Sequence, residues 1–388
     1  MDQVWANRAG TAEIAISTRH LRKLWGLPGT RLGVVGWPPV RRERYFGTWH
    51  YWWQAHLLDC LIDAQLRAPN PERLQLIRRQ IRGHWLRNPG WTNSYYDDMA
   101  WLALALQRAG RSLAIDKPRA LDKLATQFVD AWVPEDGGGI PWRKSDQFFN
   151  APANGPAGIF LARYGRVRRA TQMADWIEDT LIDPDTHLVF DGIKGGSLVR
   201  AQYTYCQGVV LGLETELAVR SGEERHRHRV ARLVAAVAEE MTDEKVLRGG
   251  GGGDGGLFPG ITARYLALVA TALPGEDDAA QTARDTAAAI VLASAQSAWD
   301  YRQNVDGLPL FGPSWDENAV IPTAVSGAAD KVDGAVNPSE VPERDLSVQL
   351  SGWMLMEAAH TVTAGAVEPL HGEIADEERE FEWDADDD

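Results

Sequence analysis

A long succession of helical segments, separated by Gly- and Pro-rich connections, is the feature that most constrains the fold of this chain. Apolar side chains recur at helical spacing at Trp53, Leu57, Leu61 and Ala64. Similar patterns predict helices over 12–24, 72–85, 117–132, 154–164, 167–181, 203–219, 226–240, 261–272, 279–300 and 346–363. The alternation of apolar and polar residues that indicates strands is almost absent. We therefore predict an all-α fold.

Four Asp-Gly turns, which begin at Asp136, Asp191, Asp254 and Asp306, divide this succession. They recur roughly every 50–60 residues, about the length of two helices with their connections, which is typical of helical repeats. About six such hairpins fit into 388 residues. Asp-Gly is also a common turn dipeptide, but the apolar residue near each turn favours a true repeat. The expected architecture is an (α/α)6 toroid, or barrel, of helical hairpins with its connections gathered at one mouth.

The expected organisation is one large domain with two flanking segments. Residues 1–45 mix a helix with a Gly/Pro-rich connection and are predicted to be an N-terminal extension that packs on the main body. Residues 46–365 form the predicted (α/α)6 domain. Residues 366–388 are dominated by Asp and Glu, and we expect them to be solvated and disordered, without a role in the site. The chain is 44% hydrophobic, enough for a large core.

Composition narrows the possible partners. The formal net charge of −14 argues against binding to nucleic acid or to an anionic membrane. The two cysteines, Cys60 and Cys206, form neither a disulfide framework nor a metal cluster. No apolar run is long enough to span a bilayer, and the polar N-terminus carries no secretory signal, so we expect a cytoplasmic protein. Sixteen Trp residues favour a carbohydrate ligand, because indole faces stack on sugar rings as well as in cores.

The strongest candidate for chemistry is the pair Asp97-Asp98, which lies between Tyr96 and Trp101 at the start of a helical run. One Asp would be enough to cap a helix, and two between aromatic rings suggest a further role. Adjacent Cα atoms lie about 3.8 Å apart, so both side chains can reach one cleft at a helix start. Retaining glycosidases need two carboxyl groups about 5–5.5 Å apart, and inverting ones roughly 6.5–9.5 Å. The spacing alone does not assign the two roles.

Several other residues are candidates for binding sugars. Tyr96 and Trp142 could stack on pyranose rings, and Asn93, Asn154, Gln207 and Asp136 could bond to hydroxyl groups. Each has a structural alternative: Trp142 could pack in the core, Asn154 could cap a helix, and Gln207 could satisfy a neighbouring backbone group. His56 and Asp59 share a helix face but lack a third ligand, so no metal and no cofactor are predicted.

Six segments in order resemble glycoside hydrolase family 76, the family of α-1,6-mannanases. They are Trp52-Trp53-Gln54-Ala55, Tyr96-Asp97-Asp98-Met99-Ala100-Trp101, Gly138-Gly139-Ile140-Pro141-Trp142, Asn154-Gly155-Pro156-Ala157, Thr204-Tyr205-Cys206-Gln207-Gly208 and Phe258-Pro259-Gly260-Ile261. The resemblance implies a retaining α-mannosidase site in which Asp97 is the nucleophile, Asp98 is the acid/base and Tyr205 contacts the substrate. The implied partner is an oligo- or polysaccharide that contains α-mannose. Pro259 departs from the family, which often has Lys there.

Two alternatives stay open at this point. One is another α/α-toroid enzyme, such as a sugar epimerase or an unsaturated-uronyl hydrolase, although no convincing His pair accompanies it. The other is a non-catalytic glycan-binding protein, which would keep the aromatic platforms and tolerate loss of either aspartate. Endo or exo action, the exact linkage and the oligomeric state do not follow from the sequence.

Overall fold

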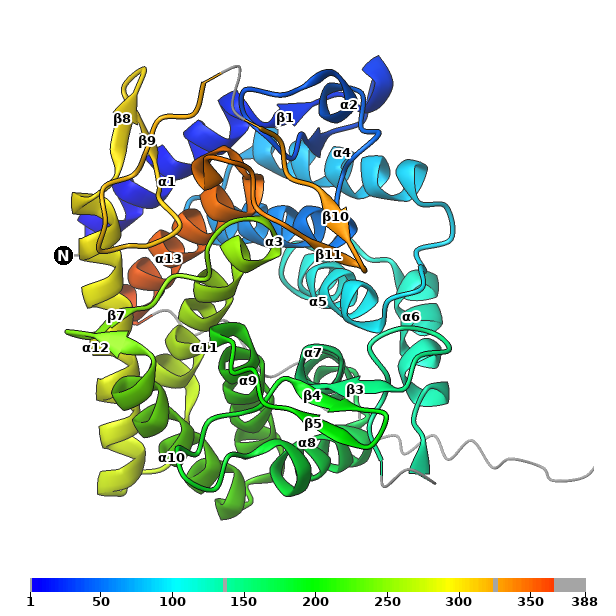
Figure 1. Cartoon of the computed structure of the whole chain (residues 1–388), viewed down its shortest axis with the longest axis vertical. Helices are drawn as coiled ribbons and strands as arrows, with labels where there is room; N and C mark the ends of the chain where they lie inside the picture. Colours follow the sequence, from blue (N-terminus) through cyan, green and yellow to red (C-terminus); the bar gives the residue numbers. More distant parts are fainter. Residues whose placement is uncertain (1, 135–137, 324–326, 366–388) are drawn as a thin grey trace, which may run out of the picture.

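Six inner helices form a closed ring in the computed structural model, which describes residues 2–134, 138–323 and 327–365 (Figure 1). The inner helices are α3 (Tyr51–Arg67), α5 (Tyr96–Leu113), α7 (Ala151–Arg163), α9 (Thr204–Ser221), α11 (Phe258–Ala272) and α13 (Leu346–Ala364). Each packs against the next one along the chain, and α13 packs back against α3. The ring is therefore closed by contacts between its first and last members.

Six outer helices surround the ring, each packed mainly against one inner helix. They are α4 (Pro71–Arg87), α6 (Pro118–Asp130), α8 (Val167–Leu181), α10 (Glu224–Glu240), α12 (Asp278–Asp300) and α1 (Asp2–Arg19). The first five each follow their inner helix along the chain, whereas α1 packs against α13 at the other end of the chain. The predicted all-α (α/α)6 toroid is confirmed.

Helix α1 corrects the helix expected over 12–24. It spans Asp2–Arg19, and Leu21–Arg22 pairs as strand β1 with β2 (Leu32–Gly33). Trp5, Ala9 and Ile16 of α1 are buried in the same core as the inner helices. The segment 1–45 thus contributes the outer helix of the pair that closes the ring.

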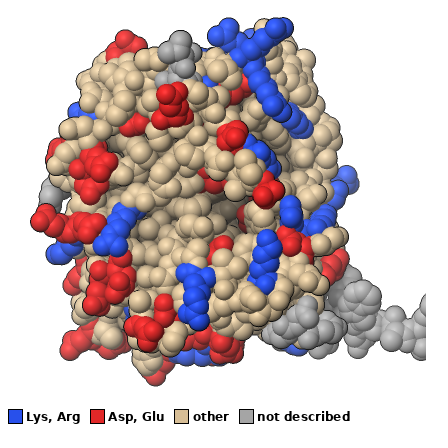
Figure 2. All heavy atoms as spheres, viewed as in Figure 1, with Lys and Arg blue, Asp and Glu red and all other residues tan. Residues whose placement is uncertain are grey.

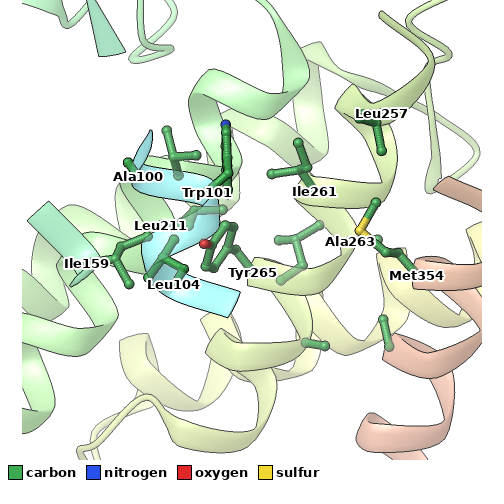
Figure 3. Packing of buried hydrophobic residues seen from close by; sticks show 14 of the residues in the cluster. Ala100, Trp101, Leu104, Ile159, Leu211, Leu257, Ile261, Ala263, Tyr265 and Met354 are labelled. Atoms are coloured by element: carbon green, nitrogen blue, oxygen red, sulfur yellow. The ribbon is translucent and has the colours of Figure 1, made fainter. Parts of the chain in front are cut away.

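The core lies between and within the two layers. In α13 every residue from Leu346 to Ala359 is buried, because this inner helix is covered on all sides. Figure 3 shows buried side chains from different inner helices, such as Trp101, Ile159 and Tyr265, which belong to one hydrophobic core. Burying one such side chain stabilises the fold by about 1.5–3 kcal/mol.

Small residues allow the inner helices to approach closely. A Cβ at Gly208 of α9 would lie 2.8 Å from the Cα of Thr262 in α11, and one at Gly260 would lie 2.6 Å from the Cα of Ser351 in α13. Both distances are shorter than van der Waals contact, so glycine is required at these crossings.

Short strands and turns occupy the connections. β3 (Phe148–Asn150), β4 (Gly192–Lys194) and β5 (Ser197–Val199) form an antiparallel sheet, and the hairpins are β6 (Thr242–Asp243) with β7 (Val246–Leu247), β8 (Gln303–Val305) with β9 (Leu308–Leu310), and β10 (Lys331–Val332) with β11 (Ala335–Val336). Short helices are α2 (Arg41–Arg44), η1 (Leu24–Gly26), η3 (Gly253–Leu257) and η4 (Pro342–Arg344). The turns at Asp191, Asp254 and Asp306 each lie in a connection from an outer helix to the next inner helix.

A cavity of about 690 Å³ lies at the end of the ring formed by the C-terminal halves of α3, α5, α11 and α13. Buried ion pairs line it: Arg108 and Arg264 both contact Asp59 and Asp63. Because these charges compensate one another, the arginines stabilise buried carboxylates next to the helix C-termini. The cavity is at the opposite end of the ring from Asp97 and Asp98, which lie at the start of α5.

Candidate active site

The N-termini of the inner helices face the second mouth of the ring, and Asp97 and Asp98 lie there in the first turn of α5. Figure 2 shows this face hollowed at its middle, with acidic atoms visible in the hollow. Backbone contacts fix where α5 begins, because the Tyr96 amide donates to the Trp142 carbonyl at 2.9 Å and the Tyr95 amide donates to Asn93 Oδ1 at 2.8 Å. The positive end of the helix dipole therefore points at both carboxylates.

Each carboxylate is oriented by its own donors. Trp142 Nε1 donates to Asp97 Oδ2 at 2.9 Å, and the Asp98 amide donates to Asp97 Oδ1 at 2.8 Å. Asn93 Nδ2 donates to Asp98 Oδ2 at 2.6 Å. Hydrogen bonds from N–H groups favour the ionised form of a carboxylate. Asp97, which accepts one at each oxygen, is therefore the better prepared of the two to carry a charge.

Asp97 and Asp98 differ in pKa because their surroundings differ. Burial raises the pKa of Asp97 to about 7, and the donors at Trp142 and Asp98 limit that rise. Burial and the neighbouring charge of Asp97 raise the pKa of Asp98 well above its usual range. Asp97 therefore loses its proton first, and Asp98 keeps its proton near neutral pH. One group is then available as a base or nucleophile and the other as an acid.

A third carboxylate, Asp254 in η3, faces the same mouth. Trp52 Nε1 and Trp53 Nε1 both donate to its Oδ1 at 3.0 Å, and the Val336 amide donates to its Oδ2 at 2.7 Å. Burial raises the pKa of Asp254 to about 6. Its charge contributes to the raised pKa of both Asp97 and Asp98, so the three groups interact. The sequence marks Asp254 only through the Asp-Gly repeat, which predicts a turn and does not indicate a functional side chain.

An aromatic strip lies at the starts of α9 and α11, next to Asp254 in η3. The ring of Tyr205 stacks on Phe258, with centroids 3.9 Å apart and planes inclined by 10°. Tyr203 lies 5.4 Å from Phe258 and is 42% exposed. Burial and nearby charges, including Asp97, raise the pKa of Tyr205. The structure thus places Tyr205 near the pair, and Tyr203 farther out is a residue that the sequence analysis missed.

The structure corrects the roles expected for Asn154 and Gln207. Both side chains are completely buried. Asn154 accepts from the Ile140 amide at 2.8 Å and donates to the Ile140 carbonyl at 2.9 Å. Gln207 forms the same kind of pair with Val189, at 2.7 Å and 2.9 Å. Their polar groups bind backbone groups and cannot reach a sugar, so they position the connections that precede α7 and α9.

The remaining predicted residues have different positions. Asn93 and Trp142 hold the two carboxylates, as described above, and both stay partly exposed. Tyr96 lies in the first turn of α5 and is partly buried against the core, and burial with the charge of Asp130 raises its pKa. Asp136 lies outside the described residues.

Lys331 of β10 brings a positive charge to the mouth. Its Nζ lies 5.0 Å from the centre of the Tyr95 ring. Its charge counteracts part of the rise in the pKa of Asp98 and of Asp254. Lys331 belongs to a long Pro/Ala/Gly/Asp-rich stretch that has no recognisable motif, so no pattern in the sequence pointed to it.

No metal centre emerges from the residues that the structure describes, because no three His, Cys, Asp or Glu side chains among them could hold an ion. His56 packs between Trp52 and Trp101, with ring centres 5.5 and 4.5 Å away, and Asp59 pairs with arginines. None of the described helices combines the length and apolar character needed to cross a bilayer.

Solved structures resemble this chain over nearly its whole length. The α-1,6-mannanase GH76A from Salegentibacter sp. HEL1_6 superimposes with a TM-score of 0.76 and 29% sequence identity, over 92% of this chain and 99% of that one. An inactive variant of that enzyme, with two consecutive aspartates replaced by asparagine, was solved with α-1,6-mannotriose and matches with 28% identity, a TM-score of 0.76 and the same coverage. The Lin0763 protein from Listeria innocua matches with 25% identity and a TM-score of 0.76, over 94% of this chain and 99% of that one.

A search of curated protein sequences finds no match. The sequence profile of glycosyl hydrolase family 76 matches residues 15–335. This range contains the paired aspartates, the third carboxylate and the aromatic strip. With the ring of helices and the carboxylates at its mouth, the match shows that the chain belongs to glycosyl hydrolase family 76 and is a glycosidase.

Proposed function

We propose that this glycosidase hydrolyses α-1,6-mannosidic linkages with retention of configuration, with Asp97 as the nucleophile and Asp98 as the general acid and base. The proposal rests on the difference between the two carboxyl groups in hydrogen bonding and in pKa. Asp97 accepts N–H donors at both oxygens, and Asp98 has the higher pKa of the two. The substrate class is supported by the Salegentibacter enzyme, which is an α-1,6-mannanase and was solved with α-1,6-mannotriose.

The first step requires both groups in different protonation states. Asp98 donates its proton to the glycosidic oxygen while a carboxylate oxygen of Asp97 attacks the anomeric carbon. The bond from that carbon to the leaving oxygen breaks, and a mannosyl ester of Asp97 forms. Asp98 is then an anion next to a neutral ester, so the charge that had raised its pKa is gone.

The second step reverses the roles. Asp98, now ionised, takes a proton from water, and the oxygen of that water attacks the anomeric carbon. The ester bond breaks and Asp97 leaves as a carboxylate. The Trp142 indole and the Asp98 amide already point at its oxygens, so the departing charge meets donors that need no reorientation. Two displacements restore the original configuration.

The test compares the wild type with Asp97→Asn and Asp98→Asn on α-1,6-mannotriose and α-1,6-mannotetraose. We expect each variant to lose at least about 10³-fold in kcat, because each group acts in both steps. Asp285→Asn, on the exposed surface of α12, is the matched control and should retain full activity. Proton NMR of the first product should show the α-anomer.

Three results would contradict the proposal. Appearance of the β-anomer first would show an inverting reaction, in which Asp97 is not a nucleophile. Full activity of either Asn variant would show that the pair is not the catalytic centre. A folded wild type that binds these oligosaccharides without cleaving them would be a glycan-binding protein on this fold.

A further inference from the structure

The two halves of the mouth differ in what covers them. Around the ring, α5 and α11 are opposite one another, with α3 and α13 between them on one side and α7 and α9 on the other. The β10–β11 hairpin extends toward the centre of the mouth on the α3 side (Figure 1). Its contacts define how far it reaches.

The hairpin contacts residues on two sides of the mouth. The Val336 amide donates to Asp254, just before α11, at 2.7 Å. Gly334 lies so close to Tyr95, just before α5, and to Trp142, in the connection to α7, that a Cβ there would be 2.8 Å from Tyr95 Oη and 2.9 Å from the Trp142 ring. The hairpin therefore crosses from the start of α11 to the start of α5 on the α3 side of the mouth.

The ring faces near the hairpin are already occupied. Lys331 Nζ lies over Tyr95 at 5.0 Å, and the guanidinium of Arg143 lies over Trp142 at 5.6 Å. Trp142 also uses its indole N–H to hold Asp97. Cations on these faces replace the stacking that a sugar would otherwise make there.

The opposite flank offers open aromatic surface. The strip runs outward from the half-buried ring of Tyr205 across Phe258 to Tyr203. Tyr203 is 42% exposed at the start of α9. Asp191 lies beside this strip, because the thiol of Cys206, the neighbour of Tyr205 in the chain, donates to its Oδ1 at 3.9 Å. A carboxylate next to an exposed ring combines a hydroxyl acceptor with a stacking face.

We propose that the glycan extends from the catalytic pair over the α9 side of the mouth, with Tyr203 as the platform for an outer sugar and the β10–β11 hairpin as the wall of the closed half. This inference rests on the proposed function for the identity of the sugar. It assigns Tyr203 to the recognition of chain length, since its ring is the exposed end of the strip, whereas Tyr205 is half-buried. Short substrates end before they reach it.

The test measures binding separately from turnover. The inactive double variant Asp97→Asn/Asp98→Asn is titrated with α-1,6-mannobiose and with α-1,6-mannotetraose by calorimetry. The same titrations are repeated with the triple variant that also carries Tyr203→Ala. We expect Tyr203→Ala to weaken tetraose binding about tenfold, equivalent to 1.4 kcal/mol, and to leave mannobiose within about twofold. Tyr203→Phe keeps the ring and should retain most of the tetraose affinity.

Two controls localise the effect. Tyr301→Ala removes an equally exposed ring, 40% accessible at the end of α12, and should change neither affinity. Val332→Ala shortens a 49% exposed side chain on the hairpin and should also be neutral.

Tetraose affinity that falls with Val332→Ala and not with Tyr203→Ala would overturn the inference, because the glycan would then lie on the hairpin. Equal losses for both oligosaccharides in Tyr203→Ala would also overturn it, since the ring would not be sensing length. Normal binding by a wild type that fails to cleave would refute the proposed function and leave this inference standing. Absence of binding to either oligosaccharide would refute the inference itself.

Discussion

Replacing Trp142 with Phe tests the central electrostatic argument, because it removes one donor and keeps an aromatic ring. The lost bond runs from Trp142 Nε1 to Asp97 Oδ2 and is 2.9 Å long. A hydrogen bond to a charged group contributes about 1.5–3 kcal/mol. The bond favours the ionised carboxylate, so its loss destabilises the form of Asp97 that attacks the sugar.

The expected size follows from the pKa scale. One pKa unit corresponds to about 1.4 kcal/mol, so loss of the bond should raise the pKa of Asp97 from about 7 by about one unit or more. The nucleophile must be ionised, and the ionised fraction grows as pH rises. The acid limb of kcat/KM should therefore move to higher pH by about one unit, and kcat/KM at pH 6 should fall about tenfold or more.

The assay is the pH profile of kcat/KM on α-1,6-mannotetraose, with thermal unfolding to confirm that the variant is folded. Trp85→Phe, on the exposed face of α4, is the matched control and should leave the profile unchanged. An unmoved acid limb in folded Trp142→Phe protein would refute the reasoning, because the indole would then not control the ionisation of Asp97. A shift of the alkaline limb alone would assign the donor to the acid instead.

Three further predictions concern the same region. Burial raises the pKa of Asp97 from 3.8 to about 7, so the charged form of this group destabilises the fold, and stability is lost as pH rises from about 4 to about 7. Asp97→Asn should therefore increase the unfolding free energy at pH 8 by about 2 kcal/mol for this partly exposed group, and should leave it unchanged at pH 4. A higher melting temperature at pH 8 and not at pH 4 would show this. Lys331→Met should raise the pKa of Asp98 further and move the alkaline limb of kcat/KM to higher pH; an unmoved limb would show that Lys331 does not act on the acid. Asn154→Ala should cost about 1–3 kcal/mol of stability, measured by denaturant unfolding, because it leaves the buried amide and carbonyl of Ile140 unpaired; a raised KM with unchanged stability would instead indicate direct sugar contact.

The overall architecture could be predicted from local patterns because every hairpin of the ring repeats the same apolar spacing within its helices and similar turns between them. Apolar spacing in segments such as Trp53 to Ala64 indicated helices, and the Asp-Gly turns indicated where one hairpin ends and the next begins. Three of those turns lie in the connections between outer and inner helices. The partner of α1 could not be predicted in this way, because its packing against α13 joins the two ends of the chain and has no local signature.

The site was predictable only in part. Asp97 and Asp98 stood out because two adjacent carboxylates exceed what a helix cap needs, and the structure places both at the mouth. Asn154 and Gln207 occur in family motifs, yet both are buried and bind backbone groups. A motif records that a residue type is required at a position and does not tell whether it contacts the ligand or supports the loop that does.

The helical repeat and the acidic pair follow from residues close together in the chain, and the family follows from short motifs that are each local. Which distant groups share the mouth depends on how the whole chain closes into a ring. Asp254 and Lys331 act on Asp98 from connections far along the chain, and the hairpin of Lys331 binds Asp254 through the Val336 amide. The physical reason is that acidity and access depend on distances through space, which the closure of the ring sets and which no local pattern encodes.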